Sequence, residues 1–248
     1  MLSKDLELSH KIGEGARADV YELDNKAIKV FKEDCDKKVV FYEAAVHSII
    51  EDTGLPIPKI YEVVKYNNSF AIIMELIKGT SLKKIILKDD NKLVSYLEKT
   101  IDLQIKIHRK ITTGLPKLKD LLREKINFSS KLNKNTKGKL IQNLDSLRNG
   151  NNLCHGDFHF DNILISNGKL VIIDWIDATI GNPVADVCRT YLLLSLYAPD
   201  NMASLYLDKY CKKTDKEPHI VLKWLPVIAG ARLSESIEGE KDRLMKWI

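Results

Sequence analysis

Two short runs of polar side chains next to apolar strands carry the clearest chemical signal in this 248-residue chain. The first run, residues 154–165, reads CHGDFHFDNILI, and the second, residues 171–175, reads VIIDW. A β-hairpin that joins them brings Asn162, where its first strand starts, close to Asp174, where its second strand ends. An amide oxygen and a carboxylate form a hard oxygen site that suits Mg²⁺. The sequence therefore predicts a magnesium site on this hairpin.

A second carboxylate, Asp157, stands five residues before Asn162 in the same loop. It can face an incoming hydroxyl and accept its proton while phosphorus is attacked. The alternative is a polar turn beside a buried hairpin, but one loop seldom combines all these residue types by chance. The neighbouring His159 either touches an acceptor or packs the loop. Asp161 and Asp177 are either groups near the substrate or solvated turn residues.

Near the amino terminus, residues 12–20 read IGEGARADV, with Gly13 and Gly15 between two strand signals. Such a glycine-rich hairpin lets backbone amides approach a polyphosphate, although an ordinary turn has the same composition. Lys29 follows in the next strand and Glu43 in the first helix. If that helix packs beside the sheet, Glu43 can hold the Lys29 ammonium against phosphate oxygens. Otherwise the two are a surface lysine and a surface glutamate.

The elements that must position these residues change character along the chain. The first third predicts a small antiparallel sheet with one helix, because short β-rich runs are separated by turn dipeptides. We expect its strands at 18–23, 26–31, 59–65 and 70–77 and its helix at 38–53. The rest is mostly helical around the one hairpin, which has strands at 162–165 and 169–174. Helices are expected at 91–110, 117–127, 184–198, 200–212 and 219–247, and residues 131–148 predict a solvated helix or loop.

Composition narrows the functional class. Lys plus Arg total 39 and Asp plus Glu 34, so the net charge of +5 is mild and does not by itself indicate nucleic-acid binding. No run approaches the length of a membrane span, and the charged start MLSKDLELSHKIG lacks a signal-peptide core. The four cysteines include no CxxC pair, which favours a reducing cytoplasm.

Taken together, these motifs resemble the aminoglycoside phosphotransferase-like family, small-molecule kinases of the protein-kinase-like fold. The matching segments run in the family's order over residues 10–235. They are the Gly13/Gly15 loop, AIKV around Lys29, YEA around Glu43, MELIKGTSL at 74–82, IH at 107–108, HGDFHFDN at 155–162, IDW at 173–175 and GNPVAD at 181–186. The HGDxxxxN and IDW combination is specific, whereas the glycine loop alone is weak.

The resemblance implies a role for each matching position. Asp157 would be the catalytic base, and Asn162 and Asp174 would be the Mg²⁺ ligands. Lys29 would contact the α- and β-phosphates of ATP and pair with Glu43. The backbone of Glu75 and Ile77 would meet the adenine edge of the nucleotide, with Met74 as the gatekeeper. Two would order the catalytic loop, His155 directly and Asp186 as a helix cap or a brace. GTP stays open as an alternative donor.

The chain also departs from protein kinases. Gly156 stands where those enzymes carry the Arg that can read a phosphorylated activation loop. Only about ten residues separate Asp174 from the next predicted helix, and no A-P-E follows. There is too little chain for a peptide-docking loop, so we expect a constitutively assembled site that acts on a small molecule.

The acceptor is expected against Asp157, walled by the helices after Asp186 and the segment from Trp224 to Glu235. Arg232 and Glu235 are spaced as an ordinary surface pair. The acidic residues 235, 238, 240 and 242 are a candidate cluster for a polycationic aminoglycoside, but Lys241 and Arg243 interrupt them. Aminoglycoside, sugar and amino-alcohol acceptors all stay open.

The sequence thus predicts an α+β, protein-kinase-like, two-lobed fold. A nucleotide-binding lobe over 1–78 would precede a catalytic and acceptor-binding lobe over 79–248. The expected protein is a cytoplasmic kinase of a small-molecule hydroxyl that needs ATP and Mg²⁺. We expect a monomer or weak homodimer, with no nucleic-acid or membrane partner. The alternatives are a nucleotide-binding pseudokinase or regulatory module and, less favoured, a protein kinase.

Overall fold

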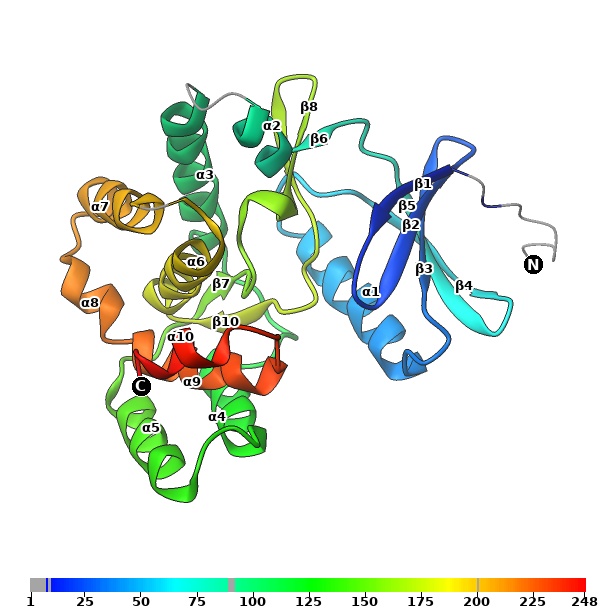
Figure 1. Cartoon of the computed structure of the whole chain (residues 1–248). Helices are drawn as coiled ribbons and strands as arrows, with labels where there is room; N and C mark the ends of the chain where they lie inside the picture. Colours follow the sequence, from blue (N-terminus) through cyan, green and yellow to red (C-terminus); the bar gives the residue numbers. More distant parts are fainter. Residues whose placement is uncertain (1–7, 9, 89–91, 200) are drawn as a thin grey trace. The chain divides into compact units, whose positions relative to one another are not determined.

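Short β-rich runs separated by tight turns build a five-stranded antiparallel sheet at the start of the chain (Figure 1). The computed structural model describes residues 8, 10–88, 92–199 and 201–248. The strand order is β1-β2-β3-β5-β4. The strands are β1 (His10–Glu14), β2 (Ala18–Leu23), β3 (Lys26–Phe31), β4 (Ile60–Tyr66) and β5 (Ser69–Glu75). Asp24 and Asn25, between β2 and β3, both have positive φ, as a two-residue type I′ turn requires.

Helix α1 (Lys37–Glu51) covers one face of this sheet. The Asp36 carboxylate caps it by accepting a hydrogen bond of 2.8 Å from the backbone N–H of Lys38. Buried Val40 of α1 packs with Phe31 and Ile72 of the sheet. The opposite face of the sheet buries a separate cluster around Ile28, Ala71 and Ile73. The helix is therefore fixed beside β3, where the expected pairing of Lys29 with Glu43 needs it.

The predicted hairpin is present as β8 (Ile163–Ser166) and β9 (Lys169–Ile172), and it forms a three-stranded sheet with β6 (Thr80–Ser81). Asn167 and Gly168 form its turn with φ of 49° and 75°. The chain divides into two compact units, and this hairpin belongs to the first one, which comprises Met1–Ile85 and Asp161–Ile176. The observed division therefore differs from the predicted lobes 1–78 and 79–248, because the first unit takes in the hairpin from the later part of the chain.

The second unit comprises Ile86–Phe160 and Asp177–Ile248 and is mostly helical. Its two-stranded sheet pairs β7 (Asn152–Cys154) with β10 (Thr179–Gly181), an element that the sequence analysis did not predict. Asn182 caps α6, whose Pro183 lies in the first turn. The helices are α3 (Leu93–His108), α4 (Leu118–Phe128), α5 (Lys134–Ser146), α6 (Pro183–Tyr197), α7 (Met202–Thr214), α8 (Pro218–Leu222), α9 (Leu225–Arg232) and α10 (Lys241–Met245), and α2 (Leu82–Lys88) spans the division between the units.

One expectation for the second unit needs correction. The run 219–247 is not one continuous helix but α8, α9, a 3₁₀ turn and α10. Pro226 opens α9, and the positive φ of Ser236 (54°) and Gly239 (78°) breaks the path to α10. Of the two alternatives predicted for residues 131–148, the structure shows the solvated helix, because α5 buries only Leu140 and Leu144. Residues 91 and 200, where two predicted helices begin, lie outside the described residues.

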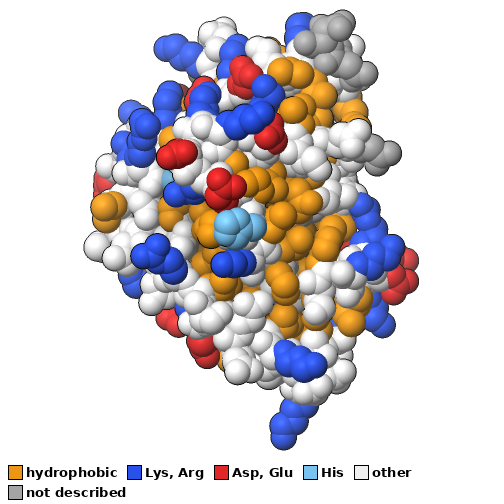
Figure 2. Space-filling model, turned by 90° about the vertical axis from the view of Figure 1, so that its left-hand side faces the viewer, with side chains coloured by type: hydrophobic (Ala, Val, Ile, Leu, Met, Phe, Trp, Pro, Cys, Tyr) orange, Lys and Arg blue, Asp and Glu red, His pale blue; other side chains and the backbone are white. Residues whose placement is uncertain are grey.

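The face that carries α3, α7 and α8 shows exposed apolar side chains with Lys and Arg side chains among them (Figure 2). No helix within the described residues is long and apolar enough to cross a membrane.

Candidate active site

The first unit gathers the side chains expected to hold a nucleotide and its metal ion. Lys29 on β3 forms an ion pair with Glu43 on α1, and its Nζ lies 3.8 Å from Oδ1 of Asp174. Burial lowers the pKa of Lys29, but the charges of Glu43 and Asp174 outweigh that effect and keep it above its ordinary value. The ammonium is therefore fixed in its charged form between two carboxylates. The alternative of two unrelated surface residues is wrong, because Glu43 is 8% exposed.

Asn162 and Asp174 lie at the same end of the β8–β9 hairpin. Asn162 ends the 3₁₀ turn Phe160–Asn162, and its carbonyl oxygen accepts a hydrogen bond of 3.0 Å from the backbone N–H of Ile173. Asp174 has a φ of 62°, a left-handed conformation that is uncommon outside glycine, and its side chain is 43% exposed. Strained polar residues of this kind often belong to functional sites. The oxygen donors of both side chains fit Mg²⁺, which takes one or two protein ligands together with substrate phosphates.

The remaining nucleotide candidates also lie in the first unit. Gly13 is in β1, and Gly15 is in the turn to β2, where its N–H donates to the carbonyl oxygen of Ala18 at 2.9 Å. This is the expected hairpin rather than a strand-to-helix turn. Met74 and Glu75 end β5, and Ile77 lies in the segment that follows it. Their contacts with a nucleotide remain predictions.

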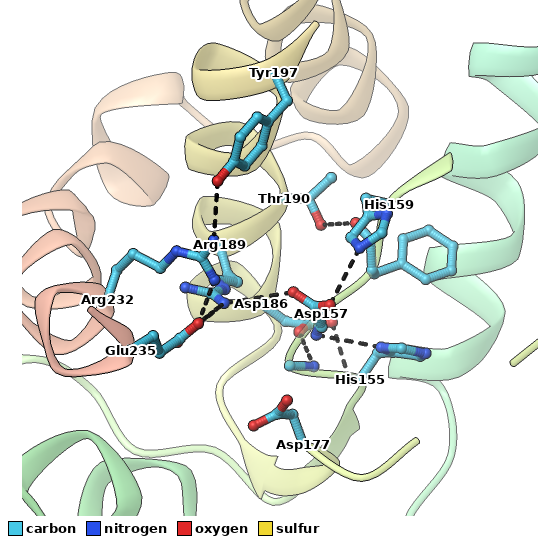
Figure 3. Close-up of polar contacts among 12 residues, drawn as sticks. His155, Asp157, His159, Asp177, Asp186, Arg189, Thr190, Tyr197, Arg232 and Glu235 are labelled. Carbon is cyan, nitrogen blue, oxygen red and sulfur yellow. Dashed lines mark hydrogen bonds and ion pairs between the residues drawn. The ribbon is translucent and has the colours of Figure 1, made fainter. Parts of the chain in front are cut away.

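The catalytic-loop candidates lie in the second unit, where the Asp157 carboxylate is held on both sides (Figure 3). His159 Nε2 lies 3.1 Å from Oδ2 of Asp157, and Arg189 Nη2 lies 3.4 Å from Oδ1. Burial raises the pKa of Asp157, but the hydrogen bond from His159 and the charge of Arg189 outweigh burial and hold it well below its usual range. Asp157 is therefore an oriented, ionised carboxylate at neutral pH.

Asp186, in the first turn of α6, holds the loop that carries Asp157 in place. Its fully buried carboxylate accepts hydrogen bonds from the backbone N–H groups of Gly156 at 2.7 Å and His155 at 3.2 Å. His108 Nε2 lies 2.9 Å from the same carboxylate. Asn182 rather than Asp186 caps α6, so Asp186 is the brace of the two roles expected for it. His155 Nδ1 accepts the backbone N–H of Asp157 at 3.2 Å, which orders the loop further.

The expected acceptor side of the second unit is a closed network of ion pairs. Glu235 accepts from Arg189 at 3.2 Å and pairs with Arg232 and Lys125. Arg232 also binds both oxygens of buried Glu240, at 2.7 and 2.8 Å. Arg232 and Glu235 are thus not an ordinary surface pair. Of the acidic residues expected as a cluster at 235–242, Glu235 and Glu240 are thus paired with cationic side chains of the chain itself.

Three other residues that were expected near the substrate lie outside this network or at its edge. Asp177 is partly exposed, 3.4 Å from Lys125 Nζ. Asp161, in the first unit, pairs with Lys83 at 2.7 Å. Trp224 does not fit its expected place in the acceptor wall, because it is only 2% exposed and belongs to the core between α8 and α9.

Comparison with protein-family models shows which family this chain belongs to. The model of the phosphotransferase enzyme family (APH) matches residues 10–220. The chain belongs to this family. The search of curated proteins found no match to this chain.

Solved structures resemble this chain in fold along most of its length. A thermostable mutant of the aminoglycoside phosphotransferase APH(4)-Ia is similar with a TM-score of 0.71 at 16% identity, covering 96% of this chain and 89% of that one. Choline kinase LicA from Streptococcus pneumoniae has a TM-score of 0.66 at 15% identity, with 96% and 92% covered. ADP-bound APH(2'')-Ib has a TM-score of 0.63 at 18% identity, with 98% and 92% covered. The α+β, kinase-like fold predicted from the motifs is confirmed.

Two residues of the candidate site were not predicted from the sequence, namely Arg189 and Lys125. Arg189 is a lone charged residue in the otherwise apolar α6 run VCRTYLLL, and this anomaly was a usable signal, since a buried charge needs a partner. Lys125 gave no such signal, because α4 is rich in charged residues and only its packing selects one of them.

Gly156 allows the backbone of the loop that carries Asp157 to lie directly against the backbone of Asp177. Its φ is +84°, and an added Cβ would lie 2.2 Å from the carbonyl oxygen of Asp177. We expect Gly156→Ala to destabilise the fold by more than the roughly 1–2 kcal/mol that a left-handed alanine costs, because the backbone must also move. Phosphotransfer should fall with it, since the movement displaces Asp157. Denaturant unfolding and kcat measure the two effects.

Gly239→Ala is the matched control, because Gly239 has a φ of +78° but no atom within 4 Å of an added Cβ. It should show the backbone cost alone and keep its kcat. Equal loss of stability and of activity in the two variants would contradict the role assigned to the Gly156–Asp177 contact.

Proposed function

We propose that this protein transfers the γ-phosphoryl group of ATP, bound with Mg²⁺, to a hydroxyl group of a small molecule. The observation that carries the proposal is the ionised Asp157 carboxylate, oriented by His159 and Arg189 on a loop that Asp186 holds. Membership of the phosphotransferase family supports it, and so do the nucleotide ligands named in similar structures, AMP-PNP with hygromycin B in one and ADP in another.

In this proposal each side chain has one task. Asp157 accepts a hydrogen bond from the acceptor hydroxyl, orients its oxygen toward phosphorus and takes its proton as the new bond forms. Lys29, held charged by Glu43 and Asp174, neutralises phosphate oxygens of the donor. Asn162 and Asp174 would hold Mg²⁺, which would screen the charge of the phosphates.

The proposal separates Asp157, which lies in the second unit, from the groups expected to hold the donor, which lie in the first. A test therefore needs binding and transfer as separate readouts. Purified protein is incubated with labelled ATP, Mg²⁺ and a panel of sugars, amino alcohols, aminoglycosides and macrolides, and ATP binding is measured by calorimetry. We expect both ATP binding and transfer to at least one hydroxyl compound. Binding without any transfer would favour a pseudokinase, and transfer only to proteins from a lysate would favour a protein kinase.

The ion pairs near Asp157 affect which charge an acceptor molecule can carry. Glu235 is engaged by Arg189, Arg232 and Lys125, so a polycation would have to displace internal cations to reach it. We propose a neutral or singly charged hydroxyl compound as the acceptor rather than a polycationic aminoglycoside. Among active acceptors, kcat/KM should be highest for compounds without several amino groups.

Substitution of Lys125 tests this preference directly. Lys125→Gln removes a cation from Glu235 and Asp177, so the KM of any aminoglycoside that reacts should fall while that of a neutral acceptor stays. Lys139→Gln on exposed α5 is the control with the same change of charge. A wild-type enzyme that prefers aminoglycosides would refute the proposed acceptor class, but it would still agree with phosphoryl transfer from ATP to a hydroxyl group.

A further inference from the structure

A basic cavity lies in the second unit away from the residues that hold Asp157. Its volume is about 640 Å³, within the range of small-molecule sites. The ends of α3 and α7 line it, together with Pro183 at the start of α6. Four cationic side chains face it, namely Lys106, Arg109, Lys213 and Lys216, against one carboxylate, Asp102.

The charges of this cavity are poorly balanced. Asp102 is paired with Lys213 at 2.6 Å, and no ion pair among the described residues involves Lys106, Arg109 or Lys216. Like charges that share one recess repel one another unless an anion lies between them. The recess therefore favours a ligand with several negatively charged oxygens.

The buried wall of the cavity supplies a second, independent sign of a ligand. His108 is 6% exposed and lines the cavity, and its Nε2 faces the carboxylate of Asp186 at 2.9 Å. Its other ring nitrogen, Nδ1, is buried and has no hydrogen-bond partner within the described residues. Such atoms are rare in native proteins, because leaving one unpaired is costly. A neutral ring that donates from Nε2 accepts at Nδ1, so its missing partner is a hydrogen-bond donor, a role that an O–H group can fill.

We propose that this cavity binds a small phosphate-bearing molecule. Phosphate oxygens would meet the four cations, and a protonated phosphate oxygen or a ligand hydroxyl would donate to Nδ1 of His108. The recess has the size of a small molecule, which favours such a ligand over a nucleic acid or a membrane surface.

Binding at this cavity reaches the loop of Asp157 through one shared carboxylate. Asp186 contacts His108 and also accepts the backbone N–H groups of Gly156 and His155. A ligand that fixes the His108 ring therefore also fixes Asp186 and slows local opening of the loop. This coupling follows from the contacts alone, and only its effect on the rate of phosphotransfer rests on the proposed function.

The experiment uses the full chain and tripolyphosphate as the probe, without Mg²⁺. Calorimetry compares the wild type with Lys106→Gln/Lys216→Gln and with the control Lys134→Gln/Lys139→Gln, which makes the same change of charge on exposed α5. We expect the cavity variant to bind at least about tenfold more weakly, as two lost charge-assisted contacts imply, and the control to bind like the wild type. Equal affinity in all three proteins would overturn the proposal.

Hydrogen exchange of the peptide that contains residues 155–159 tests the coupling without any activity assay. Tripolyphosphate should slow this exchange in the wild type and the control but not in the cavity variant. Unchanged exchange in the wild type would overturn the coupling. Binding of RNA or anionic vesicles that depends on Lys106 and Lys216, with no such dependence for tripolyphosphate, would overturn the small-molecule ligand. A chain that shows the expected binding but no phosphotransfer would refute the proposed function and leave this site standing.

Discussion

Replacing Asp157 with Asn is expected to lower kcat by about 10²–10⁴-fold, the usual contribution of a positioned general base. The amide keeps the size of the carboxylate but cannot take the proton of the acceptor hydroxyl. ATP binding should persist, because Lys29, Asn162 and Asp174 belong to the first unit and are unchanged. Steady-state kinetics and calorimetry with AMP-PNP measure the two quantities.

Asp161→Asn provides the comparison for this variant. Asp161 is a half-exposed carboxylate four residues further on and pairs with Lys83, so its loss should change kcat little. A thermal melt guards against misfolding, because Asp157→Asn also weakens the contact with Arg189. Full activity of Asp157→Asn would end the assignment of the base.

Replacing Asp174 with Asn is expected to act on binding of the donor. Asn tolerates the left-handed φ of 62°, so the substitution removes a negative charge with little backbone strain. Affinity for AMP-PNP in the presence of Mg²⁺ should fall by at least about 10–100-fold, a loss that follows even when supporting partners of metal ligands are removed. Without Mg²⁺ the variant should bind no worse than the wild type, since a carboxylate repels free phosphates.

Asp24→Asn is the control for Asp174→Asn. Asp24 also has a positive φ of 49° and lies in an exposed turn of the same unit. It should leave the dependence of binding on Mg²⁺ intact. If Asp174→Asn retained that dependence as well, the metal would have to bind through other oxygens.

The local elements of this protein were largely predictable because short-range chemistry decides them. The turns at Asp24-Asn25 and Asn167-Gly168 and the flanking β-branched runs determine two hairpins without long-range help. The run 219–247 was predicted less well. Its apolar spacing is helical, but the break between α9 and α10 depends on the left-handed residues Ser236 and Gly239, and pattern alone does not reveal their φ.

Sequence alone was enough to show which polar residues stand together in the loop 155–162, to predict the strand before Asp174 and to identify the family. The spacing of neighbours in one chain is enough for that, because hairpins and turns keep sequence neighbours close in space. The ion-pair partners of Arg189, Glu235 and His108 became evident only once the elements were packed together. Packing brought Arg189 to Asp157, joined Glu235 to three cations and set His108 against Asp186. These contacts join residues on different helices, strands and loops, and packing of the elements alone determines which charges meet.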